Sequence, residues 1–352
     1  MPHVTWTDSS RKSAFQIWFT QQCAAHDLRP ETLRVASADA SFRRYLRVTK
    51  TSGLDLIVMD SPPDLENNAA FVHVQQLMAQ AGLRVPAVLA NDATHGFLLL
   101  SDLGSHTLLG SLPLPADSLH QHLMSALDQL VMWQAATVAG ALPTYNTEVL
   151  RRELELFPTW YVSQHKGHAL NAAERNILDS AFELLCERCQ QGPQVFVHRD
   201  FMARNLMLDG SGQLGVVDFQ DALIGPVTYD IASLIRDAFH EWDDELLMDI
   251  AIRYWERVRR QPWFQFEDWS QDFGAFFKAI EWMGLQRHLK ILGIFARLTL
   301  RDGKPQYLAD TPRFIGYVHA TCSRYREFRP LLRFIESLEG LDIANAFTYG
   351  RS

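Results

Sequence analysis

Residues 197–205 read VHRDFMARN, and residues 216–219 read VVDF. The Asp200 carboxylate stands five positions before the Asn205 amide, and a second carboxylate, Asp218, follows thirteen positions further on behind an apolar run. A transferring phosphoryl group needs its charge neutralised by metal ions, and the attacking hydroxyl must be oriented and relieved of its proton. Carboxylate and amide oxygens are the ligands that Mg²⁺ prefers beside nucleotide phosphates. The pattern therefore predicts a phosphoryl-transfer site with Asp200 as the catalytic base and Asn205 and Asp218 as metal ligands.

The segments around these residues read as short strands. Strands are predicted at residues 194–197, 206–208 and 214–217, with a turn at residues 209–212. Asn205 and Asp218 therefore flank a hairpin, which brings them close in space. The spacing also matches the kinase catalytic loop, His-Arg-Asp-x-x-x-x-Asn, and the Asp-Phe pair that follows it. An ordinary hairpin with solvent-facing carboxylates is the alternative, but it leaves three polar residues beside buried strands unexplained.

The composition is typical of a soluble globular protein. The chain has 352 residues, of which 47% are hydrophobic and 21% charged, and this length suits two lobes better than one small core. The net charge is −8 and no basic stripe is present, which excludes nucleic-acid binding. No apolar run has the length of a signal peptide or a transmembrane helix, and four cysteines suit a reducing cytoplasm. We therefore expect a cytoplasmic monomer with no nucleic-acid or membrane partner.

Apolar periodicity divides the chain into two parts. The first part contains helices at residues 11–26 and 69–81 and strands at residues 41–48, 54–59 and 97–100. The second contains helices at residues 119–139, 148–162, 173–189, 230–239, 245–259 and 273–300. This order predicts an α+β, protein-kinase-like bilobal fold. Residues 1–104 are expected to form a small, β-rich nucleotide-binding lobe that ends at a hinge, and residues 105–352 a larger, mainly helical lobe with the catalytic loop and the acceptor site.

Several motifs resemble those of known kinases. The catalytic stretch resembles the aminoglycoside phosphotransferase family of small-molecule kinases, which shares its fold with choline kinase. Four further runs are similar to the anomeric amino-sugar kinases of bacterial cell-wall recycling. They are DASFRRY at residues 39–45, ELFPTWY at 155–161, MGLQRHLK at 283–290 with IFAR at 294–297, and RDGK at 301–304. The resemblance therefore extends over nearly the whole chain.

The resemblance implies a sugar kinase that uses ATP and Mg²⁺. Such kinases transfer the γ-phosphoryl group of ATP to the anomeric hydroxyl of N-acetylmuramate, and also of N-acetylglucosamine, and give the α-1-phosphate. The product feeds UDP-N-acetylmuramate synthesis in peptidoglycan recycling and bypasses part of the route that fosfomycin blocks. The alternatives are an aminoglycoside or other hydroxyl phosphotransferase and a non-catalytic binding protein on a kinase fold. The acidic run EWDDE at residues 241–245 is interpreted as the start of a helix rather than as a pocket for a polycation.

The first lobe departs from the kinase pattern in its phosphate-binding charges. Kinases hold the phosphates with a strand lysine that pairs with a helix glutamate, but the corresponding positions here are Met59 and Phe71. A degenerate, inactive kinase is one explanation. The other is that an arginine replaces the lysine, because its planar guanidinium suits phosphate oxygens.

Arg44 is the first candidate for this replacement. Leu46 and Val48 should face the core, and the two-residue period of a strand places Arg44 on their side. Arg43 or Arg47 takes this role if the register slips by one residue. The alternative is that all three are surface arginines on a strand.

The nucleotide site is expected at Ser41, Phe42, Arg43, Arg44, Ser101 and Leu103. The stretch at residues 37–41 is rich in small residues but lacks glycine, and its N–H groups with the Ser41 hydroxyl can approach phosphate oxygens. The segment after residue 100 is the expected hinge. There the Ser101 carbonyl and the Leu103 N–H are expected to bind the edge of adenine.

The substrate side is expected to combine aromatic platforms with hydrogen-bonding side chains. The candidates are Trp160, Tyr161, Gln220, Asp221, Trp282, Gln286 and Arg287. Arg287, with His288 and Lys290 on the same helix, is the candidate cation for the lactyl carboxylate of N-acetylmuramate. Core packing is the alternative for the aromatic residues, and a solvated helix face is the alternative for the charged ones.

Three residues are expected to support the site without chemistry of their own. Asp230 is expected to cap the helix that starts at residue 231. His198 and Arg199 are expected to brace the catalytic loop, because no partner at metal-ligand spacing accompanies the histidine.

Overall fold

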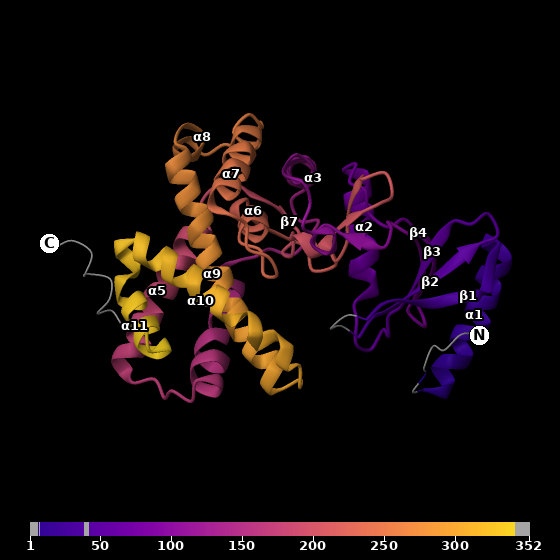
Figure 1. Ribbon diagram of the computed structural model, residues 1–352, viewed down its shortest axis with the longest axis horizontal. Coiled ribbons are helices and arrows are strands. Elements are labelled where there is room, and N and C mark those ends of the chain that lie inside the picture. The colour runs from indigo at the N-terminus through magenta and orange to yellow at the C-terminus, as the bar shows by residue number, and fades with distance from the viewer. Residues whose placement is uncertain (1–5, 7, 39–41, 342–352) are drawn as a thin grey trace. The chain divides into compact units, whose positions relative to one another are not determined.

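The structure, a computed structural model, describes residues 6, 8–38 and 42–341 of the chain (Figure 1). Their contacts group into two compact units, Met1–Ala136 with Ala203–Ala222 and Thr137–Met202 with Leu223–Ser352. The first unit extends past residue 104 and includes the predicted hairpin, so the expected lobe boundary falls inside this unit. The division into lobes at residue 104 therefore remains a prediction.

The first unit is built on a five-stranded antiparallel sheet. In spatial order its strands are β1 (Leu28–Ala38), β2 (Arg44–Lys50), β3 (Asp55–Asp60), β5 (Phe97–Ser101) and β4 (Val88–Asp92). The predicted strands at residues 54–59 and 97–100 are confirmed to within one residue, and the strand expected from residue 41 begins at Arg44. The edge strands β1 and β4 are not predicted from the sequence, because irregular pairing interrupts the apolar alternation of β1 and β4 is short and half-exposed.

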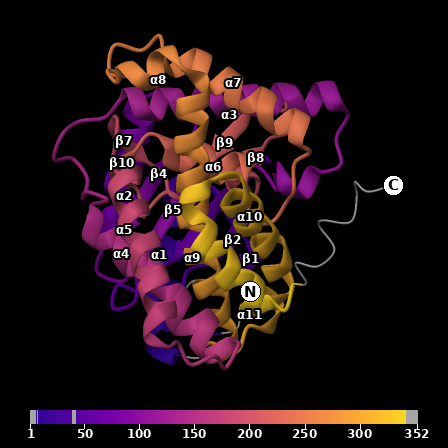
Figure 2. The same cartoon turned by 90° about the vertical axis from the view of Figure 1, so that its left-hand side faces the viewer.

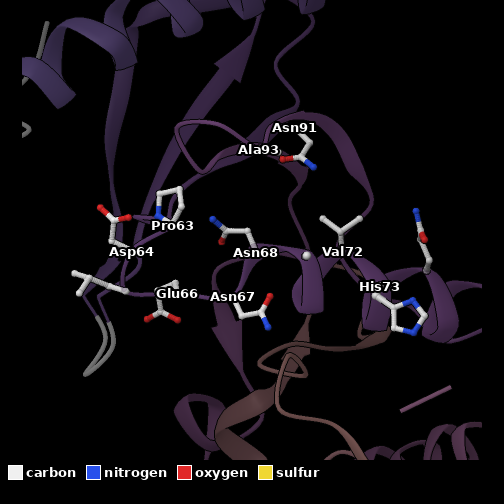
Figure 3. A pocket seen from close by; sticks show the side chains of 12 residues that line it. Pro63, Asp64, Glu66, Asn67, Asn68, Val72, His73, Asn91 and Ala93 are labelled. Atoms are coloured by element: carbon white, nitrogen blue, oxygen red, sulfur yellow. The ribbon is translucent and has the colours of Figure 1, made fainter. Parts of the chain in front are cut away.

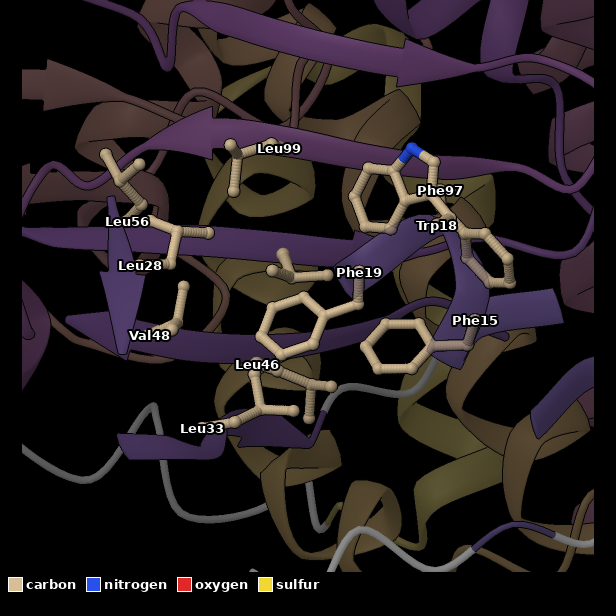
Figure 4. Packing of buried hydrophobic residues seen from close by; sticks show 11 residues of the cluster. Phe15, Trp18, Phe19, Leu28, Leu33, Leu46, Val48, Leu56, Phe97 and Leu99 are labelled. Atoms are coloured by element: carbon tan, nitrogen blue, oxygen red, sulfur yellow. The ribbon is translucent and has the colours of Figure 1, made fainter. Parts of the chain in front are cut away.

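The helix α1 (Ser9–His26) covers one face of this sheet and confirms the helix predicted at residues 11–26. Asp8 caps its start by accepting a hydrogen bond from the Ser10 N–H at 2.8 Å. Its buried aromatic side chains pack against apolar residues of the strands (Figure 4). The cluster consists of Phe15, Trp18, Phe19, Leu28, Leu33, Leu46, Val48, Leu56, Val58, Phe97 and Leu99.

Side chains that alternate with this cluster point to the opposite face of the sheet. Tyr45 pairs with Met59 across β2 and β3, and Met59 pairs with Leu98 across β3 and β5. We call this side the Met59 face and the side under the first helix the α1 face. This division determines where each arginine of β2 points.

The remaining elements of the first unit include the two strands of the predicted hairpin. The helix α2 (Asn68–Gln80) confirms the helix predicted at residues 69–81, and Asn67 caps it by accepting from the Ala70 N–H. The other elements are β6 (His106–Thr107), η1 (Leu109–Ser111), α3 (Ala116–Ala135), η3 (Ala203–Asn205), β8 (Leu206–Leu208) and β9 (Leu214–Val216). A three-stranded sheet joins β6, β8 and β9, and the antiparallel pairing of β8 with β9 confirms the hairpin.

The second unit is mainly helical and is organised around α9 (Phe273–Leu300), which has the predicted bounds. Its helical elements are α4 (Thr147–Leu154), η2 (Phe157–His165), α5 (Ala172–Cys189), α6 (Thr228–Ile235), α7 (Asp244–Val258), α8 (Glu267–Gln271), η4 (Pro305–Asp310), α10 (Thr311–Arg324), η5 (Arg326–Phe328) and α11 (Arg329–Glu339). α9 contacts η2, α10, α6 and α5. Figure 2 shows α9 with α5, α6 and α10 of the same unit. Gly293 permits the close approach of η2, because a Cβ at this position would lie 2.4 Å from the Leu156 carbonyl carbon.

Two strands, β7 (Gln194–Val197) and β10 (Leu223–Pro226), pair antiparallel in this unit. The single helix predicted at residues 148–162 is wrong: α4 ends at Leu154 and η2, a π-helical segment, follows it. Pro158 near the start of η2 lacks an N–H group and cannot continue the α-helical hydrogen bonds. Among the helices of the described residues, none is long and apolar enough to cross a membrane.

Candidate functional site

Asn205 and Asp218 lie at the open end of the hairpin formed by β8 and β9. The Val217 N–H donates to the Asn205 carbonyl at 3.1 Å, and the Asn205 side-chain amide donates to the Asp218 carboxylate at 3.3 Å. Gln220 donates to the other Asp218 oxygen at 2.9 Å. Asp218 has a φ of +67°, a left-handed conformation that costs energy for a residue with a Cβ and that is frequent at functional sites. The structure thus brings together the two side chains that the sequence predicts as metal ligands.

This oxygen pair is suited to Mg²⁺. The part of the chain that the structure describes contains no group of three or more His, Cys, Asp or Glu side chains able to hold a metal. Mg²⁺ is usually bound by one or two protein oxygens together with substrate phosphates and water, rather than by a cage of protein ligands. Asn205 and Asp218 therefore match the donor set that a Mg²⁺–nucleotide complex requires, and their role as ligands remains a prediction.

The hairpin is fixed by the segment that follows α2. The Arg84 guanidinium forms an ion pair with Asp209 at 2.6 Å and donates to the Gln213 carbonyl at 2.9 Å. The Val216 N–H donates to the Arg84 carbonyl at 2.8 Å. These contacts hold both the turn and the second strand of the hairpin.

Phe219, directly after Asp218, packs on Phe71 of α2 with ring centroids 5.0 Å apart. Phe71 stands where the kinase pattern has the helix glutamate, and its side chain is buried. An apolar contact therefore joins α2 to the Asp218 segment within this unit.

Asp200 belongs to the second unit, in the loop that follows β7. Its N–H donates to the His198 ring at 3.3 Å, and its side chain is half-buried. Arg199 has a φ of +78°, so this loop also contains a left-handed non-glycine residue. Such a conformation persists only where the surroundings hold it.

Asp230 holds this loop, which corrects the prediction that it caps a helix. The helix α6 begins at Thr228, so Asp230 lies inside its first turn and is fully buried. Its two carboxylate oxygens accept from the His198 N–H at 2.7 Å and the Arg199 N–H at 2.9 Å. Burial raises the pKa of Asp230, while the His198 ring, these N–H groups and the nearby Arg287 guanidinium oppose the rise.

Arg287 holds the same loop by donating to a backbone carbonyl group. Its guanidinium donates to the Arg199 carbonyl at 2.7 Å and to the Ser233 hydroxyl at 2.7 Å, and it is buried. The solvated helix face considered for Arg287, His288 and Lys290 is wrong, since all three side chains are buried. Burial, with Arg236 and Arg287 nearby, lowers the pKa of His288 to about 3, so its ring is neutral at pH 7.

Glu153 of α4 is a second anchor that the sequence does not suggest. Its carboxylate contacts Arg199 at 2.5 Å, Lys290 at 3.1 Å and the Tyr145 hydroxyl. Burial alone would raise the pKa of Glu153, but the two cations and the hydroxyl lower it to about 2. Its position is separated from Lys290 by 137 residues, and no local motif signals the pair.

We expect Glu153→Gln to destabilise the protein at neutral pH. The folded pKa of about 2 lies below the ordinary value of 4.5, so the carboxylate stabilises the fold above pH 4.5 and loses this effect as the pH falls towards 2. This difference between the folded and the ordinary pKa corresponds to about 3 kcal/mol in the free energy of unfolding. The stability gap between wild type and variant, measured by chemical unfolding, should be large at pH 7 and smaller at pH 3.

The exposed Glu183 of α5 offers a matched control. Glu183→Gln should leave stability nearly unchanged at both pH values, because an exposed side chain without a buried partner contributes little. An equal gap at pH 7 and pH 3 for Glu153→Gln contradicts the assigned ionisation.

Most of the predicted sugar-binding side chains are buried in packing contacts. The Tyr161 hydroxyl donates to Glu339 at 3.0 Å, and Trp282 packs on Phe328 with centroids 4.8 Å apart. Gln286 is fully buried and donates to the Tyr145 hydroxyl. For Tyr161 and Trp282 the structure shows the core packing that the sequence left open as an alternative for aromatic residues.

The other sugar candidates differ in exposure. Trp160 is half-buried, in η2. Gln220 and Asp221 belong to the first unit, where Gln220 contacts Asp218 and Asp221 is exposed. Their roles towards a substrate remain predictions.

The predicted nucleotide residues fall in the first unit. Ser41 lies outside the described residues, and Phe42 is exposed. The Ser101 hydroxyl accepts from the Ala87 N–H at 2.8 Å at the end of β5, and Leu103 is buried. Arg44 binds the buried Asp60, so its guanidinium lies on the α1 face.

A pocket of about 740 Å³ opens beside the start of α2 (Figure 3). It is lined by residues between Pro63 and Gln76 together with Asn91 and Ala93. Its lining includes none of the residues predicted for the site. The pocket therefore does not coincide with the predicted chemistry.

Comparisons with known proteins identify the family of this chain. Residues 32–263 match the model of the phosphotransferase enzyme family. The N-acetylmuramate/N-acetylglucosamine kinase of Neisseria meningitidis is 42% identical over 320 residues, which cover 90% of this chain and 94% of that protein. The kinase of the same name from Pseudomonas aeruginosa is 45% identical over 315 residues, with 88% and 89% covered.

Solved structures show the same fold at low sequence identity. Choline kinase LicA from Streptococcus pneumoniae superposes with a TM-score of 0.60 at 12% identity, covering 88% of this chain and 99% of that one. ADP-bound aminoglycoside phosphotransferase APH(2'')-Ib gives a TM-score of 0.59 at 12% identity, with 88% and 97% covered. The kinase-like fold class predicted from the sequence is confirmed.

Proposed function

The chain belongs to the phosphotransferase enzyme family, and we propose that it transfers the γ-phosphoryl group of ATP to the anomeric hydroxyl of N-acetylmuramate and N-acetylglucosamine. The observation that carries this proposal is identity of 42–45% over about nine-tenths of the chain to kinases of that name. The contact between Asn205 and Asp218 supports it, because a phosphoryl-transfer site needs this oxygen pair. The product would be the α-1-phosphate, which enters peptidoglycan recycling in the cytoplasm.

In this proposal Asp200 orients the anomeric hydroxyl and accepts its proton. An anomeric hydroxyl is more acidic than an ordinary alcohol, so a carboxylate of modest basicity is a sufficient base. Asn205 and Asp218 hold Mg²⁺, which when bound neutralises charge on the phosphates. Asp230 and Arg287 fix the peptide groups on both sides of Arg199 and so position Asp200.

The competing functions gain no specific support. The acidic run at residues 241–245, considered as a polycation pocket, begins α7, and Asp243 caps that helix by accepting from the Leu246 N–H at 2.8 Å. A non-catalytic kinase-fold protein has no need for Asp200, Asn205 and Asp218 together.

A coupled ADP-release assay with four acceptors tests the proposal. N-acetylmuramate and N-acetylglucosamine should be turned over with MgATP, whereas kanamycin and choline should give only the background rate. Turnover of kanamycin or choline without turnover of either amino sugar contradicts the proposal. The anomeric position is checked by ³¹P and ¹H NMR of the product, where a phosphate on any other hydroxyl refutes the assigned acceptor atom.

A further inference from the structure

The kinase positions that normally neutralise the phosphates carry no charge in this protein. Met59 of β3 and Phe71 of α2 are both buried, with exposed fractions of 0% and 3%. The Phe71 ring packs against the Phe219 ring. A cation for the nucleotide phosphates must therefore come from another position, and β2 with the residue before it offers three arginines.

Two of these arginines are engaged elsewhere in the first unit. Arg44 donates to the buried Asp60 at 2.8 Å on the α1 face, where Arg11 binds the same carboxylate, and it stacks on Trp6. Arg47 donates to Asp102 at 2.5 Å beyond the end of β5.

Arg43 differs from Arg44 and Arg47 in its partner. Arg43 directly precedes β2, and its partner Glu66 lies after β3, just before α2. Its guanidinium forms an ion pair with Glu66 at 2.7 Å, and its exposed fraction is 6%. The other Glu66 oxygen accepts from the Phe42 N–H at 3.2 Å, so one carboxylate holds both the backbone and the side chain at the start of β2.

Glu66 connects this cation to the metal-ligand segment. It directly precedes Asn67, the residue that caps α2, and α2 contacts Phe219 through Phe71. The Arg43–Glu66 pair and the Asp218 segment are thus both connected to the first turns of α2 within one unit. A strand lysine and a helix glutamate provide the same link between phosphate and helix in kinases.

We propose that Arg43, held by Glu66, is the cation of the nucleotide phosphate site, and that the Arg43–Glu66 pair takes the place of the lysine–glutamate pair. This inference rests on the proposed use of ATP but not on the identity of the sugar. A guanidinium has five N–H donors in a planar fork, so it can bind a carboxylate and a phosphate at once. The pair lies just before β2 and α2, whereas Met59 of β3 and Phe71 of α2 are apolar.

Nucleotide binding without sugar tests this inference separately from the catalytic proposal. Arg43→Met removes the charge and keeps a long side chain. Isothermal titration should show MgATP affinity reduced on the order of tenfold to a hundredfold, with adenosine affinity unchanged, because charge-assisted contacts to phosphate are lost. Arg34→Met is the matched control, since Arg34 forms a partly exposed ion pair with Asp55 at 2.7 Å on the same sheet and should leave both affinities unchanged.

Two further variants separate phosphate binding from a purely structural ion pair. The charge-swapped double variant Arg43→Glu/Glu66→Arg should regain thermal stability relative to Arg43→Met but not MgATP affinity. Arg44→Met should lower thermal stability, because Asp60 loses a partner, and should leave MgATP affinity unchanged. The inference is overturned if Arg43→Met binds MgATP like wild type or loses MgATP and adenosine equally, if the swapped variant recovers MgATP affinity, or if Arg44→Met shows the phosphate-specific loss. Failure of the sugar assay alone does not affect these results.

Discussion

Asp200→Asn should lower the turnover number by roughly two to four orders of magnitude, the contribution expected of a positioned general base. The substitution keeps the shape of the side chain and removes the basic oxygen. The loop should survive, because Asp230 and Arg287 hold the peptide groups around Arg199 through contacts that the Asp200 side chain does not make. MgATP affinity should therefore change little, and titration calorimetry beside the ADP-release assay checks both expectations.

A second carboxylate in the same unit provides the control for this substitution. The Asp244 side chain is 95% exposed at the start of α7, and Asp244→Asn should retain wild-type turnover. If Asp200→Asn retains more than about a tenth of the wild-type turnover number, Asp200 is not the base, because general-base catalysis contributes at least a hundredfold.

Asp218→Asn should abolish most activity and raise the Mg²⁺ concentration that activity requires. Both Asp218 oxygens accept hydrogen bonds, one from Asn205 and one from Gln220. An asparagine presents one NH₂ group, which cannot accept, so one of these amide donors is left facing another donor. The variant also loses the negative charge that makes a carboxylate a strong Mg²⁺ ligand. We expect a loss of at least about a hundredfold in turnover at 1 mM Mg²⁺, a magnitude comparable to removal of a dedicated electrostatic group.

The Mg²⁺ dependence distinguishes loss of a ligand from distortion of the hairpin. Asp209 stands in the turn of the same hairpin, where it accepts from the Ser211 N–H and binds Arg84. Asp209→Asn should lower thermal stability and leave the half-saturating Mg²⁺ concentration unchanged. An Asp218→Asn variant with the wild-type Mg²⁺ requirement contradicts its assignment as a ligand.

Local sequence was sufficient for the elements whose contacts lie close along the chain. The hairpin of β8 and β9 spans few residues, and its turn residues and apolar runs predict both the pairing and the contact between Asn205 and Asp218. The long periodic helix α9 is predicted at its observed bounds for a similar reason, since its signal accumulates over many turns. Edge strands such as β4 carry a weaker pattern because only part of their surface is buried.

Residues with strong local signals but distant partners were interpreted less well. Asp230 precedes an apolar run and resembles a helix cap, yet its carboxylate binds backbone groups 31 and 32 positions earlier. Trp282 and Tyr161 are aromatic residues in motifs that resemble sugar kinases, and both are buried in packing contacts. A hydrogen-bond partner or packing neighbour far along the chain leaves no trace in residue spacing.

The sequence by itself determined the chemical centre, because Asp200, Asn205 and Asp218 stand within nineteen consecutive positions and a hairpin places the last two together. It also determined the kinase-like fold class through the order of strands and helices. Only the tertiary structure decided which acidic residue each arginine binds. Alternation along β2 gives the side of a residue relative to its neighbours, but the pairing of β2 with β3 is what places Arg44 opposite Asp60, while Arg43, just before β2, binds Glu66.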